Sequence, residues 1–297
     1  MDVWLNGSFV PADEARVSVF DAGFQHAVGL FETIGGRHGR PFRALAHVRR
    51  LIGSATTLRL TETLRERPLV EAIGRAIEHN GLDASRVRVT LTGGDLQYPR
   101  KGGDDGPADP TILIVAQPAT PYPPAMFTDG VRVVEAMERE APLNHLAGHK
   151  TTSYWHRIQA LQGAAARGAG EAIWFSITGH LASGCVSNVF LVKDGELHTP
   201  VARGEEAEGV LPSTVLPGIT RAAVMELAET MGLTVHRRPI APEEILPSDE
   251  MFLTNASWGV LPVVGVLEHD LGAGTVGPVT QSLRERWLAL VDRETGG

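Results

Sequence analysis

The sequence has little cysteine, little lysine and no long hydrophobic run. Cys185 is the only cysteine, which excludes an internal disulfide and a metal site built from several thiolates. No segment approaches the roughly 18 uninterrupted apolar residues that a membrane-spanning helix needs. The chain has 11 histidines but no His-Glu-x-x-His pattern of a zinc site, so we expect no metal.

Charge and composition narrow the class of protein further. The formal net charge of −8 at pH 7 argues against nucleic-acid and anionic-membrane partners, because binding to phosphates needs a basic surface. A hydrophobic content of 43% with 21% charged residues is typical of a soluble globular protein with a sizeable core. Residues 1–7 lack the basic and apolar regions of a secretion signal, so we expect a cytoplasmic location.

The 297 residues are enough for two domains of ordinary size. A proline-rich segment, residues 118–126, cannot continue a helix or a sheet strand and is the predicted linker. We therefore predict an N-terminal domain over residues 1–117 and a C-terminal domain over residues 127–297 that carries Lys150. Neither part alternates regularly between strands and helices, so the predicted fold class is mixed α+β.

Hydrophobic spacing predicts the main elements of the first domain. Residues 41–60 and 68–80 are predicted helices, and residues 86–92 alternate between polar and apolar like a half-buried strand. The apolar residues at core spacing in the first of these helices are Leu45, Val48, Leu51, Ile52 and Ala55.

Lys150 is one of only three lysines among 27 basic residues. The other two, Lys101 and Lys193, lie in segments where a solvated lysine is ordinary. An arginine stays protonated, whereas a lysine whose pKa is lowered becomes a nucleophile. By spacing alone, a solvated lysine at a helix entry is the favoured interpretation of Lys150, because most lysines are of that kind.

A second pattern suggests an anion site. Gly218-Ile219-Thr220-Arg221 opens a predicted helix, where backbone N–H groups and the helix dipole attract anions, although an ordinary cap has the same sequence. Ser187 and Asn188 open a strand and also fit a simple turn, and Arg50 also fits an exposed helix position. A lysine, an anion seat and an arginine are together what a phosphorylated aldehyde cofactor needs.

Short motifs follow one another in a fixed order along nearly the whole chain. They are Val17-Ser18-Val19-Phe20-Asp21, Gly29-Leu30-Phe31-Glu32-Thr33, Pro41-Phe42-Arg43, His47-x-x-Arg50-Leu51-x-x-Ser54-Ala55, Lys150-Thr151-Thr152-x-Tyr154, Ser187-Asn188-Val189-Phe190-Leu191-Val192, Leu216-Pro217-Gly218-Ile219-Thr220-Arg221, Phe252-Leu253-Thr254-Asn255, Pro262-Val263 and Gly277-Pro278-Val279-Thr280. In this order they resemble the class IV aminotransferases, the fold-type IV pyridoxal-phosphate enzymes. That family contains branched-chain and D-amino-acid aminotransferases and aminodeoxychorismate lyase.

The resemblance implies a two-domain fold with a smaller N-terminal domain, a homodimer and pyridoxal 5'-phosphate as cofactor. It implies that Lys150 forms the imine with the cofactor and shuttles the proton, and that Arg50 binds the phosphate. It places Tyr154 beside the cofactor ring. The remaining cofactor-binding positions that it implies are Ser183, Ser187, Asn188, Gly218, Ile219, Thr220, Ala256 and Ser257.

Two positions depart from the family pattern. Ser183 stands where the family has a glutamate that pairs with the pyridine nitrogen and keeps it protonated. A serine can form a hydrogen bond with that nitrogen but cannot make it cationic, so we expect a slower or altered enzyme, unless another acid reaches the nitrogen or the cofactor is dispensed with. At Ala256 the family often has a hydroxyl residue that touches the phosphate, and Ser257 is a substitute.

The substrate is less defined by the sequence. Phe31 resembles a pocket-wall residue, and Tyr98 and Arg100 are candidates for the substrate pocket, although Arg100 also fits a solvated loop. The favoured function is an aminotransferase that acts between an amino acid and a 2-keto acid, either branched-chain-like or D-amino-acid-like. The alternative is aminodeoxychorismate lyase, which residues 254–260 resemble. A third reading, prompted by Ser183, is a non-catalytic relative.

Overall fold

The computed structural model describes residues 1–95 and 109–296, which form two compact units. The first unit contains the described residues of Met1–Thr120 and Val291–Gly297 together with His149–Ser153. The second contains Pro121–Gly148 and Tyr154–Leu290. The domain division at residues 118–126 stays a prediction. We note that contacts group Lys150 with the first unit, whereas the sequence analysis assigned it to the second domain.

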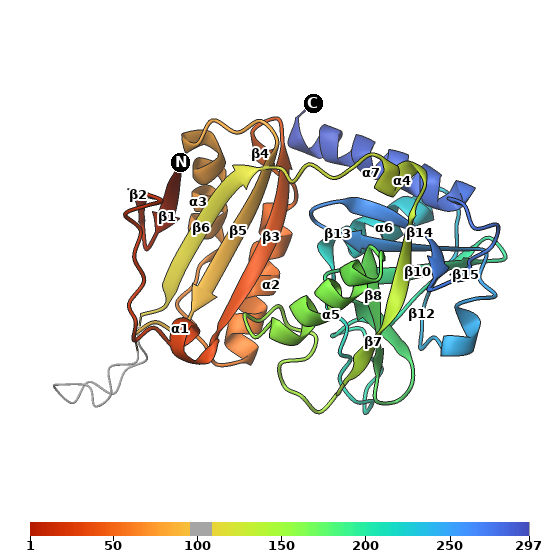
Figure 1. Cartoon of the computed structure of the whole chain (residues 1–297). Coiled ribbons are helices and arrows are strands. Elements are labelled where there is room, and N and C mark those ends of the chain that lie inside the picture. Colours follow the sequence, from red (N-terminus) through yellow and green to blue (C-terminus); the bar gives the residue numbers. More distant parts are fainter. Residues whose placement is uncertain (96–108, 297) are drawn as a thin grey trace. The chain divides into compact units, whose positions relative to one another are not determined.

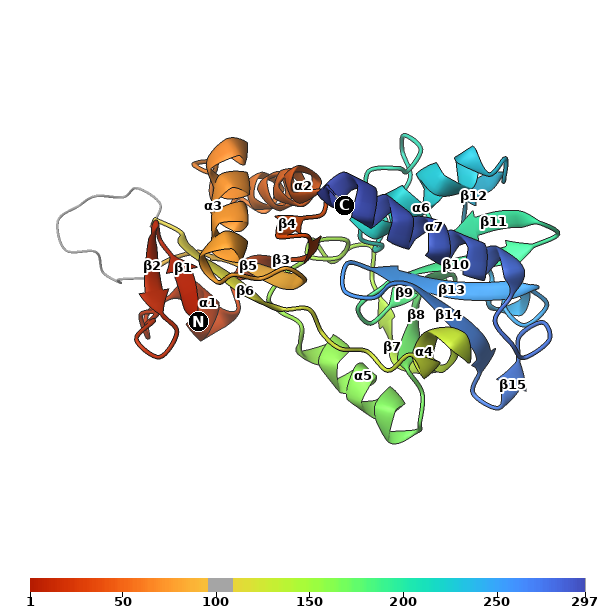
Figure 2. The ribbon, with the colours of Figure 1, turned by 90° about the horizontal axis from the view of Figure 1, so that it is seen from above.

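The first unit is built on a six-stranded antiparallel sheet in the order β2-β1-β6-β5-β3-β4. Three helices, α1 (Ala22–His26), α2 (Ala44–Thr57) and α3 (Glu66–His79), belong to this unit, and α2 and α3 cover one face of the sheet (Figures 1 and 2). The strands are β1 (Asp2–Leu5), β2 (Ser8–Pro11), β3 (Gly29–Arg37), β4 (Arg40–Pro41), β5 (Ser85–Thr92) and β6 (Thr111–Pro118).

The alternation predicted for residues 86–92 is confirmed, since Val87, Val89 and Leu91 are buried in β5 and face α2 and α3. On α2 the prediction is wrong for Leu45, whose side chain is 41% exposed. The helix begins only at Ala44, so Leu45 lies in its first turn and points away from the stripe that Val48 and Leu51 bury.

The second unit contains a nine-stranded mixed sheet in the order β12-β11-β10-β13-β14-β7-β8-β9, with β15 paired to β14. Its helices are α4 (Ala125–Thr128), α5 (Trp155–Ala166), α6 (Ile219–Thr230), a 3-10 turn at Pro242–Glu244 and the part of α7 (Pro278–Thr295) up to Leu290. The strands are β7 (Val131–Glu140), β8 (Glu171–Ser176), β9 (Leu181–Gly184), β10 (Asn188–Lys193), β11 (Glu196–Thr199), β12 (Val235–Arg237), β13 (Glu250–Asn255), β14 (Gly259–Val266) and β15 (His269–Asp270).

Two strands in the middle of this sheet, β10 and β13, are buried along almost their whole length. Near-continuous apolar runs explain this burial, because both faces of such strands are covered. Helix α5 packs on β7 and β8, and α6 packs on β12 and β13. Across residues 1–95 and 109–296, no helix has the length and apolar character needed to cross a membrane.

Candidate active site

Lys150 lies in a short segment that pairs with the start of β3. The backbone N–H of Phe31 donates to the carbonyl of Lys150 at 2.9 Å, and Thr152 N–H donates to Gly29 at 2.9 Å. The Lys150 amine lies 4.4 Å from the centre of the Phe31 ring. Because α5 begins only at Trp155, Lys150 is a half-buried residue beside a strand and is not at a helix entry.

The same segment is held from α2 through His149. Its ring Nδ1 and the hydroxyl of Ser54 are 2.9 Å apart. The Phe31 ring also contacts the guanidinium of Arg88, whose Cζ lies 3.7 Å from the ring centre. The buried Phe31 ring thus contacts both the Arg88 guanidinium and the Lys150 amine, and these contacts help to hold the amine in position.

Arg50 takes part in a buried cluster with Glu32 and His47. The Arg50 Nε and Nη2 atoms donate to the two carboxylate oxygens of Glu32 at 2.8 and 2.6 Å. Nδ1 of His47 lies 2.8 Å from the same carboxylate. Glu32 and His47 are each 2% exposed or less, so these contacts satisfy an otherwise isolated buried charge.

The cluster has a defined protonation state. Burial raises the pKa of Glu32, but the charge of Arg50 and the bonds from His47 and Arg50 outweigh it and bring the pKa to about 2. Burial lowers the pKa of His47, and Arg50 and Lys150 lower it further against the opposing effect of Glu32. An ionised Glu32 can only accept, so neutral His47 carries its proton on Nδ1.

In the second unit, the helix start predicted at Gly218 is present, since α6 begins at Ile219. Gly218 is the N-cap residue in an extended conformation, and no side chain caps the helix. Asn188 donates its amide to the carbonyl of Leu216 at 2.8 Å, and a Cβ on Gly218 would overlap the amide oxygen of Asn188. Glycine is thus required for this close approach, which leaves the backbone N–H groups of the first helical turn for an anion.

Thr254 adds a hydroxyl that the sequence analysis did not single out. It pairs directly with Asn188 across β10 and β13, so the two side chains share one face of the sheet. Its Oγ1 is buried and has no hydrogen-bond partner among the described residues. An orphaned hydroxyl beside an uncapped helix start fits a phosphate group. The predicted Ser257 instead gives its backbone N–H to Asn255 at 2.9 Å, next to the half-buried Ala256.

Ser183 lies near the end of β9 beside a half-buried arginine. Nη1 of Arg157 donates to the carbonyls of Gly184 and Cys185 at 2.9 and 3.1 Å and lies 3.4 Å from the hydroxyl of Ser183. Its Nη2 pairs with Glu140. The Tyr154 hydroxyl donates to the same Cys185 carbonyl at 2.7 Å, so Tyr154 and Ser183 border one short turn.

A second carboxylate, Glu171, organises this turn from within the sheet. Its oxygens accept from the Cys185 N–H at 3.0 Å and from the Ser187 hydroxyl at 3.2 Å. Burial raises the pKa of Glu171, and the backbone N–H donors partly oppose this. Ser187 therefore bonds to a protein carboxylate, and Glu171 and Glu140 both have partners within the unit.

Comparison with known proteins identifies the family of the chain. Residues 29–266 match the family model "Amino-transferase class IV". The branched-chain-amino-acid aminotransferase of Salmonella typhimurium is 30% identical over 302 residues, which cover 99% of this chain and 94% of that protein. The chain belongs to the class IV aminotransferase family.

Solved structures agree with this membership. The T.th. branched-chain amino acid aminotransferase with pyridoxamine 5'-phosphate has a TM-score of 0.88 at 27% identity, covering 99% of this chain and 94% of that one. The 4-amino-4-deoxychorismate lyase of Pseudomonas aeruginosa has a TM-score of 0.80 at 28% identity, covering 96% and 97%. The predictions of an aminotransferase enzyme and of its mixed α+β fold are confirmed.

The roles of the individual residues in this class IV aminotransferase stay predictions. The structure brings Lys150, Phe31 and Arg50 into the first unit, and it brings Asn188, Gly218, Ile219 and Thr220 together in the second. Tyr98 and Arg100 lie outside the described residues. Sequence reasoning missed Arg157 and Glu171, although Arg157 follows Lys150 by only seven positions.

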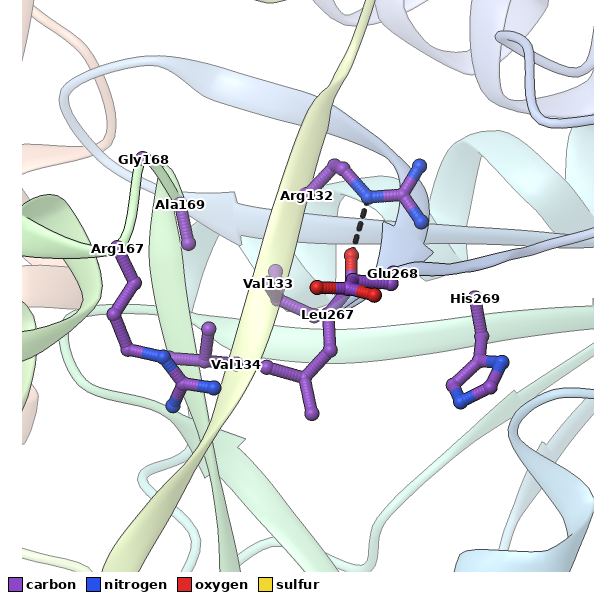
Figure 3. A pocket seen from close by; sticks show the side chains of 9 residues that line it. All are labelled: Arg132, Val133, Val134, Arg167, Gly168, Ala169, Leu267, Glu268 and His269. Carbon is purple, nitrogen blue, oxygen red and sulfur yellow. Dashed lines mark hydrogen bonds between the residues drawn. The ribbon is translucent and has the colours of Figure 1, made fainter.

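One described pocket, of about 500 Å³, contains none of the predicted site residues (Figure 3). It lies entirely in the second unit, and its lining residues are Arg132, Val133, Val134, Arg167, Gly168, Ala169, Leu267, Glu268 and His269. Arg132 donates to the Leu267 carbonyl and pairs with Asp270 at 2.7 Å, so it holds the hairpin of β14 and β15.

Proposed function

We propose that this class IV aminotransferase uses pyridoxal 5'-phosphate to transfer an amino group between a branched-chain amino acid and a 2-keto acid. The observation that carries the proposal is the Lys150 amine, held 4.4 Å from the centre of the buried Phe31 ring by backbone bonds to β3. A solvated lysine would not need this support. An apolar ring beside the reacting amine also suits an apolar substrate side chain.

The donors in the second unit fit the phosphate of the cofactor. The N–H groups of Ile219 and Thr220 would hold it, together with the Thr254 hydroxyl, which has no partner in the part of the chain that the structure describes. Arg50 is the predicted arginine. Tyr154 would lie beside the ring and Ser183 at its nitrogen. When bound, the cofactor supplies an aldehyde for amines and a ring that draws electrons from the neighbouring carbon.

Lys150 has two tasks in this proposal. Its amine would be the attachment point of the cofactor, and the same amine in its free, neutral form would accept the proton from the substrate Cα and later give it up again. The Phe31 ring limits where the Lys150 amine can lie. The backbone pairing of residues 150–152 with β3 fixes the position of Lys150 along that strand. Positioning of this kind contributes much of the rate of such a step.

The second candidate function is aminodeoxychorismate lyase. The likeness to the Pseudomonas aeruginosa lyase favours it, and so does the run Thr254-Asn255-Ala256-Ser257-Trp258. In that reaction the same lysine removes the proton, but the product that leaves is pyruvate. The Trp258 ring packs against Tyr122, at 5.8 Å between ring centres, so Trp258 also has a role in core packing.

One experiment separates the readings. The purified protein is examined for the absorbance band of lysine-bound cofactor near about 410–430 nm. Borohydride reduction and peptide mapping should then find the label on Lys150, with Lys150→Arg as the variant and the solvated Lys193→Arg as the control. A panel of L- and D-amino acids and aminodeoxychorismate identifies the substrate. A protein that takes up no cofactor contradicts the proposal, and pyruvate release from aminodeoxychorismate alone supports the lyase.

The proposed partner is a second copy of the chain. Apolar side chains are exposed in the first unit at Val19, Phe20 and Phe24, which are 63, 55 and 74% exposed. In the second unit, Leu143 and Trp155 are each 73% exposed. Exposed apolar surface of this kind marks interfaces. Light scattering should give about twice the mass of one chain, and a monomer would contradict this proposal. The cytoplasmic location stays a prediction.

A further inference from the structure

The environment of Ser183 is set by a residue that has no role in the function proposed above. Arg157 lies in α5, and its side chain is only 15% exposed. Its guanidinium pairs with Glu140 and bonds to the carbonyls of Gly184 and Cys185. With a carboxylate and two carbonyls as partners, the group is held in one place, with Nη1 at 3.4 Å from the Ser183 hydroxyl oxygen.

The direction of the hydrogen bond at Ser183 follows from the chemistry of the two groups. A guanidinium has donors only, so in the 3.4 Å contact between Nη1 and Oγ the serine oxygen must accept. Ser183 is 5% exposed, and its own hydroxyl hydrogen therefore points at an acceptor other than Arg157. The nearby carbonyls of Gly184 and Cys185 already receive Arg157.

From the direction of the hydrogen bond at Ser183, we infer that Arg157, acting through Ser183, keeps the pyridine nitrogen of the bound cofactor unprotonated. The inference rests on the proposed function and on the resemblance that sets Ser183 against that nitrogen. An unprotonated pyridine nitrogen is an acceptor and completes the bonding of the serine. A protonated nitrogen is a donor, so it would leave the serine hydrogen without this acceptor and bring a second positive charge toward the guanidinium. Arg157 is thus a positioning residue.

The two nearby carboxylates, Glu140 and Glu171, are both bonded to other groups of the protein. Glu140 is bound to Arg157, and Glu171 is bound by the N–H groups and the hydroxyl of residues 185–187. Neither carboxylate is placed to supply the charge that a glutamate at position 183 would supply. The unprotonated ring would therefore withdraw less electron density from the substrate Cα than a protonated ring. The rate of proton removal would then depend more strongly on the position of Lys150.

The test is nitrogen-15 NMR of the holoenzyme loaded with cofactor labelled at the ring nitrogen, recorded across the pH range in which the protein is folded. The expected signal is that of a neutral pyridine throughout. In Ser183→Glu we expect a pyridinium signal. The double variant Arg157→Met/Glu140→Gln removes both members of the ion pair, so neither charge is left buried without its partner. In this paired variant we expect the ring nitrogen to protonate at a higher pH than in the wild type. The control Arg167→Met, from an exposed arginine that follows the same helix, should leave the signal unchanged.

A pyridinium signal in the wild-type holoenzyme overturns the inference and leaves the proposed function standing, because the cofactor is then bound. Failure to bind cofactor overturns both. A neutral signal that the paired variant does not shift assigns the effect to Ser183 alone and overturns the role of Arg157. The wild-type measurement decides the protonation state even where a variant fails to fold.

Discussion

The Glu32–His47–Arg50 cluster gives a quantitative prediction for the substitution Glu32→Gln. A fall in the pKa of Glu32 from 4.5 to about 2 corresponds to about 3 kcal/mol of stability at neutral pH. The estimate agrees with the roughly 3–5 kcal/mol that loss of one partner of a buried ion pair costs, since Arg50 would keep its charge at 11% exposure. We therefore expect Glu32→Gln to destabilise the protein by about 3 kcal/mol.

The pH dependence has a defined sign. The pKa of Glu32 is lowered in the folded state, so its contribution is present above pH 4.5 and is lost as the pH falls toward about 2. The pKa of neutral, buried His47 is also lowered, so below pH 6.5 the unfolded chain gains a proton that the folded chain does not, and stability falls there too. Glu32→Gln should remove the first of these losses.

The assay is urea unfolding followed by fluorescence at pH 7, 5 and 4, analysed from the transition that reports the first unit. The matched control is Glu66→Gln, because Glu66 pairs with Arg49 while both side chains are about half exposed. A solvated pair of this kind contributes about 0–1 kcal/mol. Equal effects of the two substitutions, or an unchanged acid dependence in Glu32→Gln, would refute the reasoning.

Three further substitutions test the phosphate seat and the lysine. Thr254→Val removes a hydroxyl that has no partner in the described structure, so stability without cofactor should stay within about 1 kcal/mol while cofactor affinity falls about tenfold, as measured by thermal unfolding and titration. Gly218→Ala should lower both stability and affinity, because its Cβ overlaps Asn188; Gly163→Ala, in open space within α5, is the control and should be neutral or stabilising. Lys150→Arg should abolish turnover but leave the fold intact in circular dichroism, and residual turnover near the wild-type rate would contradict its role.

The elements that the sequence predicts well are those with a local cause. In β5 the alternation of apolar residues shows directly in the burial of Val87, Val89 and Leu91. Gly218 before Ile219 and Thr220 predicts a helix start, and α6 begins at Ile219. Such patterns depend on neighbours within a few residues, which the sequence contains.

Contacts between distant segments could not be predicted in this way. Arg50 was expected to bind a phosphate, and nothing local indicates that its guanidinium meets Glu32, which lies 18 positions earlier on another element. Arg157 and Ser183 are 26 positions apart, and they meet only because α5 packs on β7 and β8 next to the end of β9. The prediction that Leu45 is a core residue was wrong for a related reason, because the position of the helix start decides which residues of the first turn are buried.

Two buried glutamates show how the surroundings decide what a carboxyl group does. Glu32 faces a guanidinium and an imidazole, and the pKa falls to about 2, so the group remains a charge that orients Arg50. Glu171 faces backbone N–H groups and a serine hydroxyl, no cation in residues 1–95 and 109–296 is bonded to it, and burial raises its pKa. The residue type is the same in both cases, and the pKa shifts in opposite directions because only Glu32 has a compensating cation bonded to it among the described residues. The same argument applies to position 183, where Arg157 has a carboxylate partner in Glu140 but leaves the serine hydroxyl to donate, so a ring nitrogen bonded there has no acid from which to take a proton.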